Sequence, residues 1–213
     1  MEEYDIKRLL DIQGFSVSHM KFQEDNKIPD VKIYLKRDEK RYQCSGCGEY
    51  YSNYYDRHEY WVQDLPYGKW KKSWLIFDQV RVNCPHCGVV VEKLGWKEKY
   101  ARYTNRLAEE VAMECRLIQS IGQVAGRFFL NWETVKEIDK AYLNKELNPP
   151  NFDGVEYIAI DEISIKKRHK YATIVAEAIR SRVLWVVKDR SKESMNYYGL
   201  KVRSIFEFKL RLS

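Results

Sequence analysis

Cys44-Ser-Gly-Cys47 and Cys84-Pro-His-Cys87 are the two stretches that decide the fold of the first half of this chain. A glycine, Gly48 or Gly88, directly follows each pair, and 36 residues lie between the pairs. Two residues between cysteines allow one tight turn to aim both sulfurs at a single point, and the glycine allows the backbone to curl past a metal ion. Zinc takes four thiolate ligands in a tetrahedron. We therefore predict one closed structural zinc site made by Cys44, Cys47, Cys84 and Cys87; a disulfide or a redox pair is the alternative.

Alternating apolar residues around these pairs predict strands that present them. The long gap between the pairs requires a strand, and Lys72–Asn83 supplies one with Trp74, Ile76, Val80 and Val82 on a single face. Residues 1–100 are therefore predicted to form a β-rich, zinc-ribbon-like domain, to whose folding metal binding contributes on the order of 10 kcal/mol. The other elements expected in this domain are a short amphipathic helix over Tyr4–Ile12 and strands over Phe15–Phe22, Val31–Lys36 and Val89–Val91.

The composition favours a folded protein of a reducing compartment. Hydrophobic residues make up 45% of the chain, which is enough for a core. The first residues are acidic and lack an apolar signal segment, and no apolar run is long enough to span a membrane. Cysteines stay reduced in the cytosol, which favours metal binding over disulfides. The fifth cysteine, Cys115, is expected to be a small buried residue in a helix and not a metal ligand.

The net charge of +6 lies almost entirely in the last part of the chain. Residues 1–153 are nearly neutral as a whole, and residues 154–213 carry the excess of basic side chains. Binding of nucleic acid by the middle of the chain must therefore be argued from residue pattern, because net charge there does not support it.

The middle of the chain, residues 101–150, has the pattern of a helix-turn-helix domain. Val135 and Ile138 face inward on a helix that follows another helix after a short turn, an arrangement that binds DNA in many proteins; an ordinary helical hairpin is the alternative. The mixed charges of the second helix weaken the DNA interpretation, because phosphate contacts favour Lys and Arg. The expected N-caps are Thr104, Ser120 for Ile121–Phe128, and Asn131 for Trp132–Leu143. The residues expected to face DNA are Asn131, Glu133, Thr134, Lys136 and Lys140.

A new alternation of strands follows the boundary signal Asn148-Pro-Pro-Asn151. Tyr157–Ile160 is a continuous apolar run, typical of a strand buried on both faces, and it is expected to end at Asp161. A carboxylate at the end of a central strand is able to hold a divalent metal, although a plain turn residue is the alternative. The remaining elements expected here are strands over Tyr171–Val175 and Arg182–Val187, a helix from Ser191, and a basic turn over Lys166–Lys170, whose Lys166, Lys167 and Arg168 are candidate DNA contacts.

The order of these features resembles the bacterial insertion-sequence transposases of the ISL-three family, which have a zinc-binding N-terminus, a helix-turn-helix and a DDE catalytic domain of RNase H-like fold. The resemblance extends to about Tyr198. It therefore implies an α+β multidomain protein whose third domain, 151–213, is the first part of an RNase H-like domain. The stretches that carry it are the two cysteine knuckles, Arg102–Leu107, Asn131–Ile138, Ile160–Thr173 and Val183–Val186.

The resemblance implies metal-dependent cleavage and transfer of DNA strands at transposon ends. In the family, three carboxylates hold two Mg²⁺ or Mn²⁺ ions, and Asp161 matches the first of these carboxylates. The implied partner is transposon-end DNA, with a homo-oligomer on that DNA and no membrane. The implied location is the nucleoid of the bacterial cytoplasm.

The sequence departs from the family after the third predicted strand. Asp189 and Glu207 do not stand where the second and third carboxylates are expected, and Gly199–Ser213 loses the match. We therefore expect a C-terminally truncated, catalytically incomplete form. Two alternatives remain: a zinc-dependent DNA-binding regulatory protein without catalysis, and a metal-dependent nuclease complete within these residues.

Overall fold

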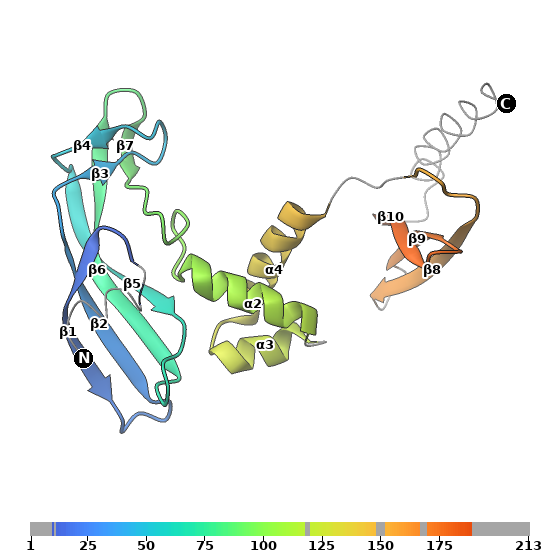
Figure 1. The fold of residues 1–213 in the computed structure, drawn as a ribbon, viewed down its shortest axis with the longest axis horizontal. Coiled ribbons are helices and arrows are strands. Elements are labelled where there is room, and N and C mark those ends of the chain that lie inside the picture. The colour runs from blue at the N-terminus through green and yellow to red at the C-terminus, as the bar shows by residue number, and fades with distance from the viewer. Residues whose placement is uncertain (1–9, 11, 118–119, 148–151, 167–169, 189–213) are drawn as a thin grey trace. The chain divides into compact units, whose positions relative to one another are not determined.

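The computed structural model describes residues 10, 12–117, 120–147, 152–166 and 170–188 (Figure 1). The chain forms two compact units, Met1–Glu146 and Leu147–Ser213. Several sequence expectations lie outside the described residues: most of the helix over Tyr4–Ile12, the boundary Asn148–Asn151, the helix from Ser191 and the tail Gly199–Ser213.

The first unit is built on a five-stranded sheet with the order β1-β2-β6-β5, in which β7 also pairs with β6. Strands β2 and β6 run parallel, and the other pairs are antiparallel. The strands are β1 (Phe15–Gln23), β2 (Asp30–Arg37), β5 (Asp56–Asp64), β6 (Lys72–Cys84) and β7 (Gly88–Val91), and a small separate sheet holds β3 (Tyr42–Gln43) and β4 (Tyr50–Tyr51). The expected strands β1, β2, β6 and β7 are confirmed, whereas β3, β4 and β5 were not expected.

The main core of the sheet is aromatic. The rings of Phe15, Phe77 and Trp96 meet edge to face, with centroids 5.2–5.8 Å apart. Such pairs contribute about 0.5–1.5 kcal/mol beyond the area that they bury. Phe77 and the fully buried Leu75 lie on the face of β6 opposite to the alternating set expected from the sequence. Both faces of this strand are therefore apolar, and the period-two reading found only one of them.

Three helices complete the first unit, and they follow the sequence expectation closely. They are α2 (Asn105–Leu117), α3 (Ile121–Phe128) and α4 (Trp132–Glu146). The Thr104 hydroxyl accepts a hydrogen bond from the Leu107 amide (3.3 Å), and the Asn131 side chain accepts one from the Glu133 amide (3.0 Å), so both predicted caps form. Ser120 also stands at the N-cap of its helix, but its side chain makes no capping bond.

A buried cluster holds the three helices together. Leu107, Val111, Val124, Val135 and Ile138 are all at most 1% exposed. Val135 and Ile138 face inward as expected. Helix α3 ends at Phe128, and the left-handed backbone of its C-cap residue Phe129 (φ 54°) turns the chain toward α4, which begins at Trp132. The result is a compact helix-turn-helix.

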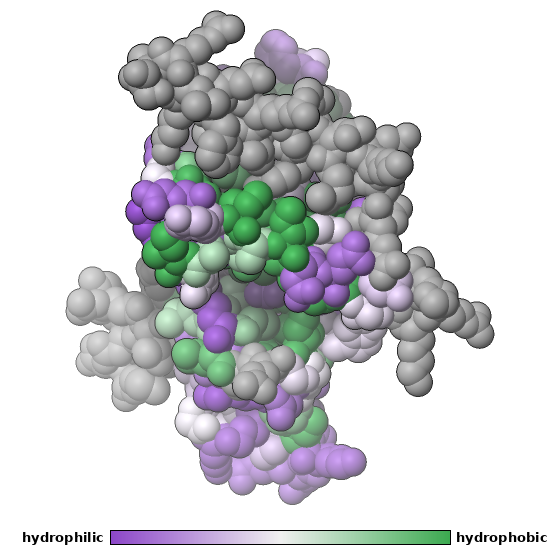
Figure 2. All heavy atoms as spheres, turned by 90° about the vertical axis from the view of Figure 1, so that its right-hand side faces the viewer, coloured by the Kyte–Doolittle hydropathy of each residue, from purple (hydrophilic) through white to green (hydrophobic). Residues whose placement is uncertain are grey.

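The second unit contains an antiparallel sheet with the order β10-β9-β8. Its strands are β8 (Ile158–Lys166), β9 (Lys170–Glu177) and β10 (Arg182–Lys188). Two expectations are wrong here. The run Tyr157–Ile160 is not buried on both faces, since Tyr157 is 63% and Ile160 49% exposed, and β8 does not end at Asp161 but continues to Lys166. Exposed apolar side chains gather on this unit, as the green atoms of Figure 2 show.

Candidate metal centre and nucleic-acid interface

The two cysteine pairs meet in space. The Sγ atoms of Cys44, Cys47, Cys84 and Cys87 all lie within 4.8 Å of one another, and those of Cys47 and Cys84 are 3.6 Å apart. A tetrahedral ion with bonds of ~2.3 Å to sulfur separates its ligands by roughly 3.8 Å. A disulfide needs about 2.05 Å, and all five cysteines are free thiols. The arrangement therefore fits a closed, four-thiolate metal centre.

The backbone around the cysteines depends on glycine at three positions. Gly48 and Gly88 have left-handed backbones, with φ of 84° and 71°. A side chain at Gly46 would place its Cβ atom only 2.6 Å from Cys87 Sγ, so the first knuckle packs directly against the second. The sequence indicated the role of the two trailing glycines, but the close approach at Gly46 emerges only from the fold.

The thiols do not ionise alike without a cation. A hydrogen bond from the Tyr51 hydroxyl to Cys84 Sγ (3.2 Å) lowers the pKa of Cys84 to about 6. Burial, reinforced by hydrogen bonds with the neighbouring thiols, raises the pKa of Cys87 to about 12. Four thiolates in this small space repel one another, and a divalent ion removes that repulsion and brings all four pKa values down.

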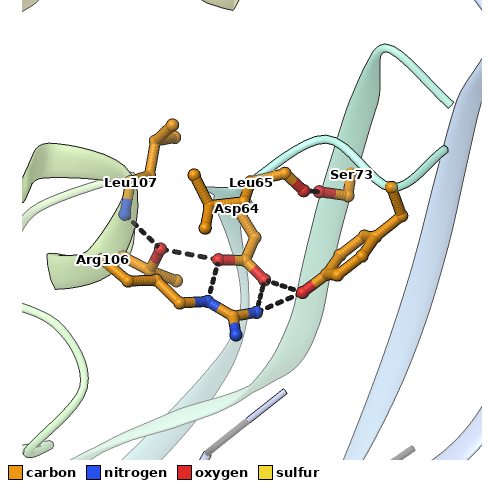
Figure 3. Close-up of polar contacts among 7 residues, drawn as sticks. Asp64, Leu65, Ser73, Arg106 and Leu107 are labelled. Carbon is orange, nitrogen blue, oxygen red and sulfur yellow. Dashed lines mark hydrogen bonds and ion pairs between the residues drawn. The ribbon is translucent and has the colours of Figure 1, made fainter. Parts of the chain in front are cut away.

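A buried polar network joins the sheet to the helices (Figure 3). The Asp64 carboxylate, at the end of β5, forms an ion pair with Arg106 of α2 and also accepts hydrogen bonds from Thr104 Oγ1 (2.7 Å) and Tyr67 OH (2.8 Å). The Asp64 side chain is fully buried, whereas that of Arg106 is 25% exposed. One carboxylate thus fixes both the end of the sheet and the start of the first helix.

A second contact continues this junction. The Gln63 side-chain amide donates to the Phe128 carbonyl (2.7 Å), at the C-terminal end of α3. The Gln63 backbone also pairs with Arg102 and Thr104, at 2.8 and 3.0 Å. Two consecutive residues of β5 therefore contact the helices: Gln63 contacts α3, and Asp64 contacts α2. Neither this strand nor the two contacts were predicted from the sequence.

The predicted DNA-facing residues of α4 all lie at or near the surface. Glu133, Lys136 and Lys140 are exposed and Thr134 is half-buried. Asn131 is exposed as well, but its side-chain oxygen is already engaged by the capping bond. The sequence did not single out Trp132, in the first turn of α4, which is 55% exposed and whose ring centroid lies 5.9 Å from Lys136 Nζ.

Asp161 lies within β8, opposite Ile174 of β9, and is exposed. Its carboxylate accepts a hydrogen bond from the Glu162 amide (2.8 Å). Within the described residues, the four cysteines are the only group of three or more side chains placed to share a metal ion. Asp189 and Glu207 lie outside those residues, as do Lys167 and Arg168 of the basic turn.

Comparison with known proteins agrees with this architecture. Residues 92–143 match the signature described as "Helix-turn-helix domain of transposase family ISL3", and residues 158–204 match a second signature of the same family, described as "Transposase". The transposase for insertion sequence element IS1001 of Bordetella parapertussis is 36% identical over 185 residues, which cover 85% of this chain and 44% of that protein. The transposase for IS1557 of Mycobacterium tuberculosis is 26% identical over 189 residues, with 85% of this chain and 42% of that protein covered. No solved structure matches.

The fold and the matches define a helix-turn-helix protein with a four-cysteine centre and a transposase segment. Both signatures are those of the ISL3 family of insertion-sequence transposases, which this chain resembles over residues 92–143 and 158–204. The chain spans less than half the length of the relatives above. Among the described residues, no helix is both long and apolar enough to cross a membrane.

Proposed function

We propose that this chain binds the ends of its insertion sequence through α3, the turn and α4. The observation that carries the proposal is the geometry of α4, which buries Val135 and Ile138 and presents exposed Lys136 and Lys140. In helix-turn-helix proteins, the N-terminal part of the second helix contacts base edges in the major groove. The match of residues 92–143 to the helix-turn-helix of the family supports the same assignment.

The metal that fits the four cysteines best is zinc, because it prefers thiolate ligands in a closed tetrahedron. Its role here is structural. Strand β6 runs from Cys84 at the metal centre to Ser73, whose hydroxyl donates to the Leu65 carbonyl beside the Asp64 network. Zinc thus stabilises the sheet on which the helix-turn-helix is mounted.

Binding of DNA is tested by comparing salt dependence between matched double variants. Lys136→Ala with Lys140→Ala is expected to weaken binding to a duplex from the element's end and to lower the salt slope by ~2, since each lost phosphate contact removes about one unit. Lys27→Ala with Lys69→Ala changes the net charge equally in two exposed turns between strands of the sheet and serves as control. An equal loss in both pairs means a nonspecific basic surface, and the assignment to α4 then fails.

The chemistry of the whole family protein is a separate proposal. In it, Asp161 serves as the first of the carboxylates that hold Mg²⁺ or Mn²⁺ for strand cleavage and transfer. Support comes from the match of residues 158–204 to the family's transposase signature and from the exposed position of Asp161 on β8.

A second candidate is DNA binding without strand cleavage by this chain. The position of Asp161 favours it, because in the described part of the chain Asp161 belongs to no group of three or more acidic or metal-binding side chains placed to share an ion. We expect no nicking of element-end DNA by the purified chain in Mg²⁺ or Mn²⁺. Nicking that disappears in Asp161→Ala, with Glu156→Ala as an exposed acidic control, contradicts this expectation and establishes a complete active site.

A further inference from the structure

A strained loop lies beside the first turn of α4. In this loop, Lys97–Arg102, the Ala101 amide donates to the Glu98 carbonyl (3.1 Å) and closes a turn. Tyr100 has a left-handed backbone (φ 63°) and is nevertheless 64% exposed. A bulky residue rarely adopts that conformation, and such strain persists only where the surroundings impose it.

The surroundings of this loop do impose its shape. The Tyr60 hydroxyl of β5 donates to the Tyr100 carbonyl (3.0 Å), and the buried Lys97 donates to the Glu98 carbonyl (3.0 Å). The guanidinium of Arg102 lies over the Tyr60 ring, 4.6 Å from its centroid. The sheet therefore holds the backbone at Tyr100, whose side chain is exposed to solvent.

A groove of about 560 Å³ separates this loop from α4. That volume lies within the ~300–1,000 Å³ of sites that hold a small molecule. Glu133, Thr134 and Glu137 of α4 line one side, and Lys99, Tyr100 and Arg102 of the loop line the other.

The side chains that line the groove favour a base of DNA over a phosphate group. The carboxylates of Glu133 and Glu137 repel a phosphate but accept hydrogen bonds from the amino group of cytosine or adenine. An exposed tyrosine ring offers a stacking surface for a base. Lys99 Nζ lies over the Tyr100 ring, 5.2 Å from its centroid, and offers a cation to the adjoining phosphate.

We propose that this groove receives one unpaired cytosine or adenine of the DNA bound by α4. The base stacks on Tyr100, and its amino group faces Glu133 and Glu137. This inference rests on the proposed DNA binding and adds to it a preference for DNA with a base outside the double helix. Because the strain at Tyr100 costs stability, a role in binding also explains why tyrosine stands at this position instead of glycine.

The test uses the full chain with zinc and a set of duplexes that contain the bound sequence. One unpaired base, either cytosine or thymine, is moved stepwise along the DNA flanking that sequence. At one position, the chain is expected to bind the cytosine duplex about 5- to 100-fold more tightly than the thymine duplex. Replacing Glu133 and Glu137 together with glutamine is expected to reduce this preference, because an amide accepts more weakly than a carboxylate.

Tyr100→Gly separates a binding role from a structural one. Glycine relieves the strained backbone, so the melting temperature is expected to rise or stay unchanged while affinity for the cytosine duplex falls at least ~5-fold. Tyr157→Ala, which removes an equally exposed ring from the second unit, is expected to leave affinity unchanged.

Each failure has its own meaning. If the wild-type chain binds none of the duplexes, the proposed function is wrong. If it binds all of them equally, DNA binding stands and the groove proposal is overturned. A fall in melting temperature together with affinity for Tyr100→Gly also overturns it, because the ring is then part of the core.

Discussion

Removal of zinc, or replacement of Cys84 with serine, is expected to unfold the part of the sheet near the metal centre. Cys44 and Cys84 are buried, and the cluster around them contains only three other buried residues, Tyr42, Val80 and Val82. Binding of structural zinc in small domains contributes on the order of 10 kcal/mol, which is comparable to the whole stability of a typical domain. The burial of so few side chains does not make up for the lost free energy of zinc binding.

Circular dichroism and thermal melting with and without a zinc chelator measure this effect. Cys115→Ser is the matched control, because Cys115 is a half-buried free thiol of α2 that packs beside the helical cluster. We expect the control to keep its zinc and to melt close to the wild-type chain. A chelated chain that melts at the wild-type temperature contradicts a structural role for the metal.

Removal of zinc is expected to weaken DNA binding as well. Strand β6 connects Cys84 to Ser73, and Ser73 contacts the loop that follows Asp64. Unfolding at one end of this strand removes the support of α2 and α3 at the other. Affinity for element-end DNA is therefore expected to fall on chelation and to return when zinc is restored.

The features that the sequence predicted well are those set by local chemistry. Two Cys-x-x-Cys turns have one productive geometry, and the caps Thr104 and Asn131 act within three residues of themselves. The same locality explains the helices, whose apolar spacing marks one inward face. Each of these signals is contained in a few neighbouring residues.

The features that the sequence did not predict depend on distant partners. Strand β5 includes Arg57, Glu59 and Asp64, so its composition is typical of a loop, and pairing with β6 makes it a strand. Asp161 follows an apolar run and was expected to end its strand, yet antiparallel pairing with β9 continues the strand to Lys166. In both places a long-range backbone ladder outweighs the local preference.

Replacement of Asp64 with alanine is the second large expected effect. The substitution removes the acceptor shared by Arg106, Thr104 and Tyr67, and takes the paired carboxylate away from the largely buried Arg106 guanidinium. Breaking such a pair costs about 3–5 kcal/mol, and the partial exposure of Arg106 places the expected loss near the lower end. Denaturant unfolding of the zinc-loaded chain measures this loss in the free energy of unfolding. In thermal unfolding, the melting temperature is expected to fall by on the order of 10 °C.

Asp56→Ala provides the matched control, because Asp56 lies on β5 like Asp64 and forms an ion pair with Arg81 of β6. Both partners of that pair are more than 40% exposed, so its loss is expected to cost at most ~1 kcal/mol. Equal losses for the two variants contradict the special role of the buried network.

A variant with both Asp64→Leu and Arg106→Met tests the reason for the loss. If the cost of Asp64→Ala arises from an uncompensated charge, removing both charges is expected to recover a large part of the stability. Asp64 also holds the first helix to the end of the sheet through Thr104 and Arg106. The double variant is therefore expected to fold with zinc but to bind DNA more weakly than the wild-type chain, since an apolar contact lacks the directional hydrogen bonds that orient α2. Recovery of stability together with full DNA affinity shows that Asp64 stabilises the junction without orienting the helices.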